Sequence, residues 1–183
     1  MARKSRSSSL SVKLSAAAIA AAVAVQVGDR DMSISERGVD ALMQYEDCRL
    51  VVYRDSAGHP TAGCGHLVTD GEYRVGQKLS ESEIRQLFID DLIPLNDCVN
   101  RGLNGKKTDK PKRDALGIFA FNVGCAGFLR SAVLREHNSG NYRAAAKAFA
   151  LWNKERRGGK LVVSNGLTNR RSKEAALYLS TYE

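Results

Sequence analysis

Two carboxylates and one hydroxyl are spaced along a short stretch of the chain in a pattern suited to acid-base chemistry. Eight residues separate Glu46 from Asp55, and five more separate Asp55 from Thr61. A pair of carboxyl groups, one protonated and one ionised, is what hydrolysis of a glycosidic bond requires. Residues 45–66 are therefore the candidate catalytic unit.

The two carboxylates are expected to lie in different surroundings. Val39, Leu42 and Met43 precede Glu46 at helical spacing, which places Glu46 on the buried stripe of a helix. Burial disfavours the charged form of a carboxyl group and raises its pKa. Asp55 follows an arginine in a polar turn, where the ionised form is favoured. Surroundings alone can thus separate an acid from a base.

A helix and a β-hairpin are expected to position these groups. Ser33 and Glu36 form a capping-box pattern for a helix that runs through Tyr45. Apolar alternation over residues 50–53 predicts a strand, and a second strand is expected after Pro60, beyond a polar turn.

The rest of the chain is predicted to be helical. Ser80 and Glu83 form a second capping box, and apolar residues then recur at helical spacing to about Leu103. Pro94 should kink or divide this long helix. Glycines at 124–127 should break the next helix, and the predicted helices after Leu103 are 111–123, 131–138, 142–152 and 168–180.

The catalytic unit resembles the signature of phage-type lysozymes, the endolysin muramidases of glycoside hydrolase family 24. Glu46, Asp55 and Thr61 match the family's spacing, and a Gly-x-Gly-His block at 63–66 follows them. The similarity spans roughly residues 33 to 180, and its other blocks are 119–124, 127–128, 152–153, 158–159 and 166–171.

This resemblance implies an α+β, two-lobed fold and a reaction. A small hairpin lobe of about 31–80 and a helical lobe of about 104–183 would be joined by a helix of about 80–103. The implied activity is hydrolysis of the β-1,4 bond between N-acetylmuramic acid and N-acetylglucosamine in peptidoglycan, with inversion and lysis of the host cell. No cofactor or metal is expected, and the protein is expected to be a monomer that does not bind nucleic acid.

The resemblance also assigns roles to residues. Glu46 would donate the proton to the leaving oxygen, while Asp55 and Thr61 hold the attacking water. His66 is expected to shape the hairpin, and Arg170 to meet Glu46, with neighbouring Arg171 as the alternative. The residues expected to bind substrate in the cleft are Leu67, Phe121, Asn122 and Ser131.

Two other classes of function, one enzymatic and one non-catalytic, are compatible with parts of this pattern. A lytic transglycosylase needs the acid Glu46 but not the residues that handle water, Asp55 and Thr61. A non-catalytic protein that binds cell wall, or a basic nucleic-acid-binding protein, would need none of the three. The chain has no internal repeat, P-loop or dinucleotide-binding fingerprint.

The N-terminal residues 1–30 read as an export segment. The formal net charge of the chain is +8, and this segment holds Arg3, Lys4, Arg6, Lys13 and Arg30 against Asp29. An uncharged, alanine-rich run at 14–27 follows the basic flank. It is either a cleaved signal peptide or, as in some phage endolysins, a signal-arrest-release segment, which we favour. Host export machinery and the inner membrane would then be partners, and the enzyme would reach the host periplasm while tethered.

Four cysteines are present, and they lack the paired spacing of a metal site. An even number in an exported protein favours disulfides. We expect Cys98 to pair with Cys125 and Cys48 with Cys64. Four buried free thiols are the alternative.

Overall fold

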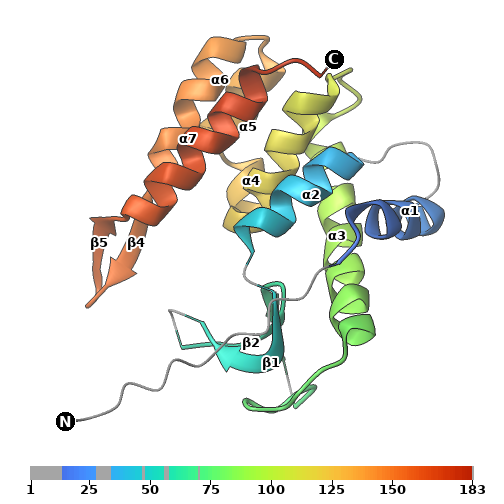
Figure 1. Cartoon of the computed structure of the whole chain (residues 1–183). Coiled ribbons are helices and arrows are strands. Elements are labelled where there is room, and N and C mark those ends of the chain that lie inside the picture. Colours follow the sequence, from blue (N-terminus) through green and yellow to red (C-terminus); the bar gives the residue numbers. More distant parts are fainter. Residues whose placement is uncertain (1–13, 28–33, 47, 56–57, 70, 183) are drawn as a thin grey trace.

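The computed structural model describes residues 14–27, 34–46, 48–55, 58–69 and 71–182. Figure 1 shows a small β-sheet at one end of the molecule and a group of helices at the other, with one long helix, α3, running beside both. This arrangement confirms the expected α+β, two-lobed fold.

The small lobe is built on a three-stranded antiparallel sheet. Its strands are β1 (Arg49–Arg54), β2 (Pro60–Gly63) and β3 (His66–Leu67), in that order. Thr61 in the central strand is paired with Tyr53 on one side and with Leu67 on the other. The predicted hairpin is confirmed, whereas the two-residue strand β3 was not predicted.

Helix α2 (Glu36–Tyr45) leads into this sheet and ends where expected. Its N-cap is Ser35, whose hydroxyl accepts a hydrogen bond from the Gly38 N–H. The prediction that placed the cap at Ser33 is wrong by two residues, and Ser33 itself lies outside the described residues. Buried Asp114 accepts hydrogen bonds from the backbone N–H and hydroxyl of Ser35, at 2.6 Å each, which fixes the start of α2.

The long helix α3 (Glu81–Leu103) begins at the predicted capping box. The Ser80 hydroxyl accepts from the Glu83 N–H, and the Glu83 carboxylate accepts from the Ser80 N–H. Asn104, in the left-handed conformation, ends the helix. Pro94 lies inside α3 and does not divide it.

The helical lobe starts with α4 (Lys110–Leu129), whose backbone departs from helical geometry at Gly124, with φ 75° and ψ 158°. The expected glycine break is therefore confirmed at one residue, after which the chain resumes helical geometry. The later helices are α5 (Ala132–Asn138), α6 (Tyr142–Ala148), the 3₁₀ helix η1 (Phe149–Trp152) and α7 (Asn165–Leu179).

The prediction that this lobe is wholly helical is wrong. Strands β4 (Lys154–Arg157) and β5 (Lys160–Val163) form an antiparallel hairpin that projects from the helices. The turn consists of Gly158 and Gly159, both with positive φ, a conformation typical of two-residue hairpin loops.

One hydrophobic core connects the sheet, α3 and the helical lobe. Val52 and Ala62 from the sheet, Phe88 from α3 and Phe119 from α4 are each at most 1 % exposed. Phe119 contacts several aromatic rings edge to face, which are those of Phe128, Phe149 and Trp152.

The alanine-rich run forms helix α1 (Ala16–Val27), which lies on the outside of α2 and α3. Ile19 and Val23 are fully buried there, whereas Val25 is 83 % exposed. Within the described residues, α1 is too short for a membrane span, and only the bent pair α4 and α5, taken together, has the length and composition of one. The boundary at residue 30 lies in an undescribed part of the chain and stays a prediction.

Candidate active site

Glu46 lies at the point where α2 ends and the chain turns toward the sheet. It is the C-cap of α2, with an extended backbone, and its N–H donates to the Leu42 carbonyl at 3.2 Å. A Cβ atom built on Gly65 would lie 3.4 Å from Glu46 Oε2 and 4.0 Å from the ring of Phe121. The carboxyl group therefore faces the turn between β2 and β3, and glycine at 65 leaves space beside it.

An arginine meets Glu46 from the other lobe. Arg170 Nη2 in α7 lies 3.0 Å from Glu46 Oε1, with side-chain exposures of 11 % and 17 %. Burial raises the pKa of Glu46 above its ordinary value, and the charge and hydrogen bond of Arg170 oppose that shift only in part. A raised pKa is what a proton donor working near neutral pH needs.

Asp55 lies at the end of β1, where its side chain is more exposed than that of Glu46. Its Oδ1 accepts from the His59 N–H at 2.8 Å, its Oδ2 lies 3.5 Å from the His59 ring, and its side chain is 36 % exposed. The backbone hydrogen bond from Asp55 N–H to the His59 carbonyl closes the same turn. The carboxylate is thus oriented by the backbone while solvent can still reach it.

The hydroxyl of Thr61 is held at the start of the returning strand. Thr61 is 4 % exposed, and its Oγ1 donates to the His59 carbonyl at 3.1 Å. A hydroxyl that donates once still has lone pairs that can accept a hydrogen bond from water. Asp55 and Thr61 are therefore tied to one residue, His59, within a single turn.

A cleft of about 320 Å³ opens between the two lobes, and Glu46, Asp55 and Thr61 are not among its lining residues. Gly65 and Leu67 line it from the sheet, Pro94 from α3, and Phe121 and Cys125 from α4, among others. Leu67 and Phe121 were both expected in the cleft, and the structure places them there. Leu67 is 54 % exposed, which leaves an apolar side chain open to a sugar ring.

His66 connects the sheet to its neighbours. Its Nδ1 lies 3.0 Å from Asp91 in α3, and its Nε2 lies 3.2 Å from Glu72. Burial lowers the pKa of His66, but the hydrogen bonds and charges of Asp91 and Glu72 outweigh burial and raise the pKa overall. This placement suits the expected role in shaping the hairpin.

The other two expected substrate-binding residues lie in different settings. Asn122 is exposed next to Phe121, and its Oδ1 accepts from Arg171 Nη2 at 2.7 Å. Ser131 is 3 % exposed, and its hydroxyl caps α5 by accepting from the Leu134 N–H. Ser131 does not line the cleft described above.

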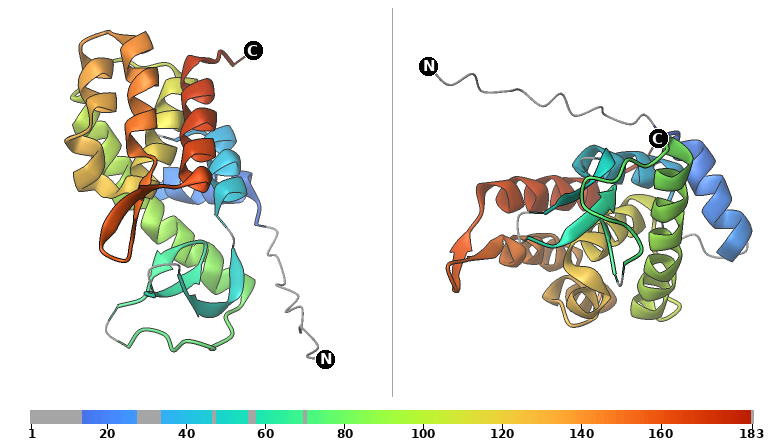
Figure 2. Two further views of the ribbon diagram at one scale, coloured as in Figure 1. Left: turned by 90° about the vertical axis from the view of Figure 1, so that its left-hand side faces the viewer. Right: turned by 90° about the horizontal axis from the view of Figure 1, so that it is seen from below.

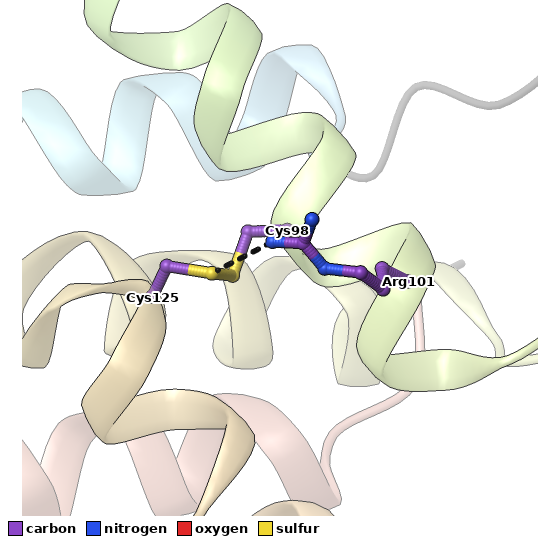
Figure 3. Close-up of a disulfide and its surroundings, with 3 residues drawn as sticks. All are labelled: Cys98, Arg101 and Cys125. Carbon is purple, nitrogen blue, oxygen red and sulfur yellow. Dashed lines mark hydrogen bonds between the residues drawn. A yellow bond between two sulfur atoms is a disulfide. The ribbon is translucent and has the colours of Figure 1, made fainter.

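Both expected disulfides are present. The bond between Cys48 and Cys64 ties the residues just after Glu46 to the β2–β3 turn, and the bond between Cys98 and Cys125 ties α3 to α4. Figure 3 shows Arg101 reaching over the second disulfide, where its Nη2 lies 3.3 Å from Cys125 Sγ. The alternative of four free thiols is therefore wrong.

Sequence reasoning missed one member of the site, the buried carboxylate Glu174. It lies four residues after Arg170 and three after Arg171 in α7, and it contacts both guanidinium groups. Acidic and basic residues at these helical spacings commonly pair, so the spacing was an available signal. Among the residues with described side chains, no group of three His, Cys, Asp or Glu is arranged to hold a metal ion.

Comparison with known proteins identifies the family of this chain. The chain matches the family described as phage lysozyme over residues 43–174. The endolysin of Salmonella phage P22 is 35 % identical over 151 residues, which are 81 % of this chain and 99 % of that protein.

Two further relatives agree. The SAR-endolysin of Escherichia phage Mu is 33 % identical over 138 residues, 75 % of this chain and 76 % of that protein. The solved structure of the endolysin from Escherichia coli O157:H7 phage FAHEc1 superposes with a TM-score of 0.74 at 36 % identity, covering 80 % of this chain and 92 % of that one. The chain belongs to the phage lysozyme family.

Proposed function

We propose that this lysozyme hydrolyses the β-1,4 bond between N-acetylmuramic acid and N-acetylglucosamine, with Glu46 as the general acid. The observation that carries the proposal is the buried carboxyl of Glu46, whose pKa is raised, beside the cleft residues Gly65 and Phe121. A protonated carboxyl there can give its proton to the leaving glycosidic oxygen.

The water that attacks the sugar is assigned to Asp55 and Thr61. Asp55 is more exposed than Glu46 and is oriented through two contacts to His59, and the Thr61 hydroxyl retains acceptor capacity. An ionised carboxylate can take a proton from the water, and the hydroxyl can help to fix its position. Attack by a held water on the face opposite the leaving group gives inversion of the anomeric carbon.

Substrate contacts are proposed for the cleft side chains. Leu67 and Phe121 line the cleft and offer apolar surface to the sugar rings. Asn122 is not among the lining residues but is exposed next to Phe121, and its amide nitrogen can donate to a substrate oxygen while its oxygen remains bound to Arg171. Peptidoglycan is the proposed partner, and release of the host cell contents is the proposed outcome.

Location is proposed from the N-terminal segment. The relatives named SAR-endolysins support a tethered, exported form for this chain, in which residues 1–30 hold the enzyme at the inner membrane facing the host periplasm.

The test replaces Glu46 by Gln, which keeps the shape but removes the transferable proton. Lysis of purified cell walls is expected to fall by about 10²–10⁴-fold, the usual contribution of general acid catalysis. Asp55→Asn keeps an oxygen that can accept from the His59 N–H and removes only the charge. It should also lose most activity because the neutral amide cannot take a proton from the attacking water. Circular dichroism would confirm that both variants are folded.

Product analysis separates hydrolysis from its closest rival. Mass spectrometry of the released fragments should show reducing ends that carry one added water. Near-normal lysis by folded Glu46→Gln, or 1,6-anhydro ends from the wild-type enzyme, would contradict the proposal, the latter in favour of a lytic transglycosylase.

A further inference from the structure

A buried carboxylate behind the active site connects two of its members. Glu174 Oε1 lies 3.1 Å from Arg170 Nε and 2.9 Å from Arg171 Nη2. Arg170 reaches onward to Glu46 at 3.0 Å, and Arg171 reaches onward to Asn122 at 2.7 Å. One oxygen atom thus holds two guanidinium groups, and each guanidinium holds a different residue of the site.

The cluster is closed off from water. The side chains of Glu174 and Arg171 are 0 % and 1 % exposed, and that of Arg170 is 11 % exposed. Charges in such surroundings interact more strongly than charges on the surface. One cation, Arg170, therefore acts directly on Glu46 from behind, and the carboxyl group of Glu174 contacts that cation from its other side.

We propose that Glu174 is a positioning residue for the reaction. It holds Arg170 against Glu46 and Arg171 against Asn122, and its negative charge limits the pull of Arg170 on Glu46. The proposal rests on the proposed role of Glu46 as the general acid. Glu174 itself need not touch substrate.

The physical reason lies in the protonation that a general acid requires. Glu46 must carry a proton to donate one, but the guanidinium group of Arg170 favours its ionised form. Burial raises the pKa of Glu174 to about 7, and the negative charge of Glu46 adds to that shift. Because coupling between two charges is reciprocal, the charge of Glu174 in turn favours the protonated form of Glu46. Removing that charge should leave Glu46 ionised at pH values where it now holds its proton.

The charged and titratable groups near Glu46 come from three sides. Arg170, Arg171 and Glu174 lie on α7, as does Lys173, whose ammonium group lies over the ring of Tyr45 in α2. From the sheet, His66 follows Gly65, but its ring nitrogens are bound to Asp91 and Glu72. Of these groups, Glu174 is the anion joined to Glu46 through a shared guanidinium.

The first experiment measures the pH dependence of kcat/KM for Glu174→Gln on soluble peptidoglycan oligosaccharides. Glutamine keeps a carbonyl oxygen for both arginines but has no charge. The basic limb of the profile, which reports loss of the proton from the acid, should move down by about one pH unit, a typical effect of a close charge. At pH values above both limbs, activity should then fall about tenfold.

The matched control is Glu136→Gln. Glu136 also pairs with an arginine, Arg135, at 3.1 Å, but it lies on the surface of α5 and contacts none of the site residues described above. Its profile should follow that of the wild type. A parallel change in both variants would show that the loss of any ion pair, rather than this one, moves the limb.

A second pair of variants covers the case in which Glu174→Gln does not fold. Arg170→Gln removes the cation that acts directly on Glu46 and should move the basic limb upward. The double variant Arg170→Gln with Glu174→Gln removes one charge of each sign and should return the limb toward the wild-type position. KM should change little in these variants because Arg171 still holds Asn122. A purely structural role would not reverse the direction of the limb.

A direct titration of Glu46 by ¹³C NMR in the same folded proteins keeps the two proposals distinguishable. A pKa of Glu46 that is the same in the wild type and in all folded variants would overturn the role of Glu174. A pKa that moves as expected, without any change in the activity profile, would instead contradict Glu46 as the acid and leave the electrostatic coupling intact.

Discussion

The carboxyl groups of Glu46 and Asp55 lie in two different environments. Glu46 leaves the end of α2 into a buried corner against Arg170, whereas Asp55 lies in a turn at 36 % exposure, with its oxygen bound to a backbone N–H. Burial in the first environment raises the pKa of Glu46 above its ordinary value.

The low exposure of Glu46 was predictable from the local sequence pattern, but its ion pair with Arg170 was not. The apolar stripe ahead of Glu46 predicts its burial, and Val39 and Leu42 are indeed buried. The contact between Glu46 and Arg170 crosses 124 positions of the sequence, and only the family resemblance indicated it. Glu174 was missed because a single helical acid beside two arginines usually reads as a solvated surface pair.

His137 carries a pH-dependent contribution to stability. Burial, together with the charges of Lys106 and Lys112, lowers its pKa from 6.5 to about 4, and its ring contacts the Tyr178 hydroxyl at 2.6 Å. Between these two values the unfolded chain binds a proton that the folded chain does not bind. Stability from His137 is therefore complete above pH 6.5 and is lost as the pH falls toward 4, by about 1.4 kcal/mol per pH unit.

The measurement is urea unfolding of His137→Gln and wild type from pH 7 to pH 4. Glu174, whose pKa is raised to about 7 by burial, acts with the opposite sign over part of this range, so the effect is the difference between the two proteins. The wild type's advantage should shrink with acidity. Exposed His59 supplies the control His59→Gln, and a constant difference for His137→Gln would refute the assignment.

At the scale of elements, the break in α4 depends on one glycine. Gly124 has φ 75° and ψ 158°, a region that side-chain-bearing residues almost never occupy, and it precedes Cys125, which lines the cleft. Nothing lies within 4 Å of a Cβ atom built there, so the cost of a side chain is conformational. Gly124→Ala should lower the free energy of unfolding by about 1–3 kcal/mol.

Gly117 in the same helix is the matched control. A Cβ atom at Gly117 would meet Ile34 at 3.6 Å, an ordinary contact, and its backbone is helical. Gly117→Ala should therefore be neutral or stabilising by up to about 1 kcal/mol. Thermal unfolding of both variants decides the matter, and equal effects would show that the conformation at Gly124 is not the cause.

The elements found from sequence are those with a strong local signal. The capping box at Ser80, the periodic apolar residues of α3 and the alternation in β1 all matched the structure. The hairpin of β4 and β5 was missed because its strands are short and mostly exposed, so no apolar alternation marks a buried face. Helix α7 begins at Asn165, three residues before the predicted start, and its first turn contains Gly166, a residue with low helix propensity.

At the scale of the whole molecule, α1 relates the enzyme to the proposed tether. Ala18 and Gln26 are exposed on the docked helix, and neither lines the groove of about 620 Å³ between α1 and the body. Leucine at these two positions gains in a bilayer but little in the docked form. Ala18→Leu with Gln26→Leu should hold more protein in the membrane fraction and delay lysis.

A second variant should weaken the packing of α1 against the body of the enzyme. Ile19→Ala with Val23→Ala removes the two fully buried side chains of α1 and lowers its apolarity as well. Fractionation of expressing cells measures how much of each variant is in the membrane, and mass spectrometry shows whether its N-terminus is intact. A protein that is cleaved after the segment, or a leucine variant that lyses on the wild-type schedule, would replace the tether with an ordinary signal peptide.

The docked position of α1 offers the segment an apolar environment other than the membrane. Ile19 and Val23 are 0 % exposed against the body, and full burial of such side chains is worth about 1.5–3 kcal/mol each. In the proposed tether, the segment would exchange contacts with lipid for contacts with the apolar surface of its own enzyme, and not for contacts with water alone. Because its alanines bind lipid weakly, the burial of Ile19 and Val23 would favour release.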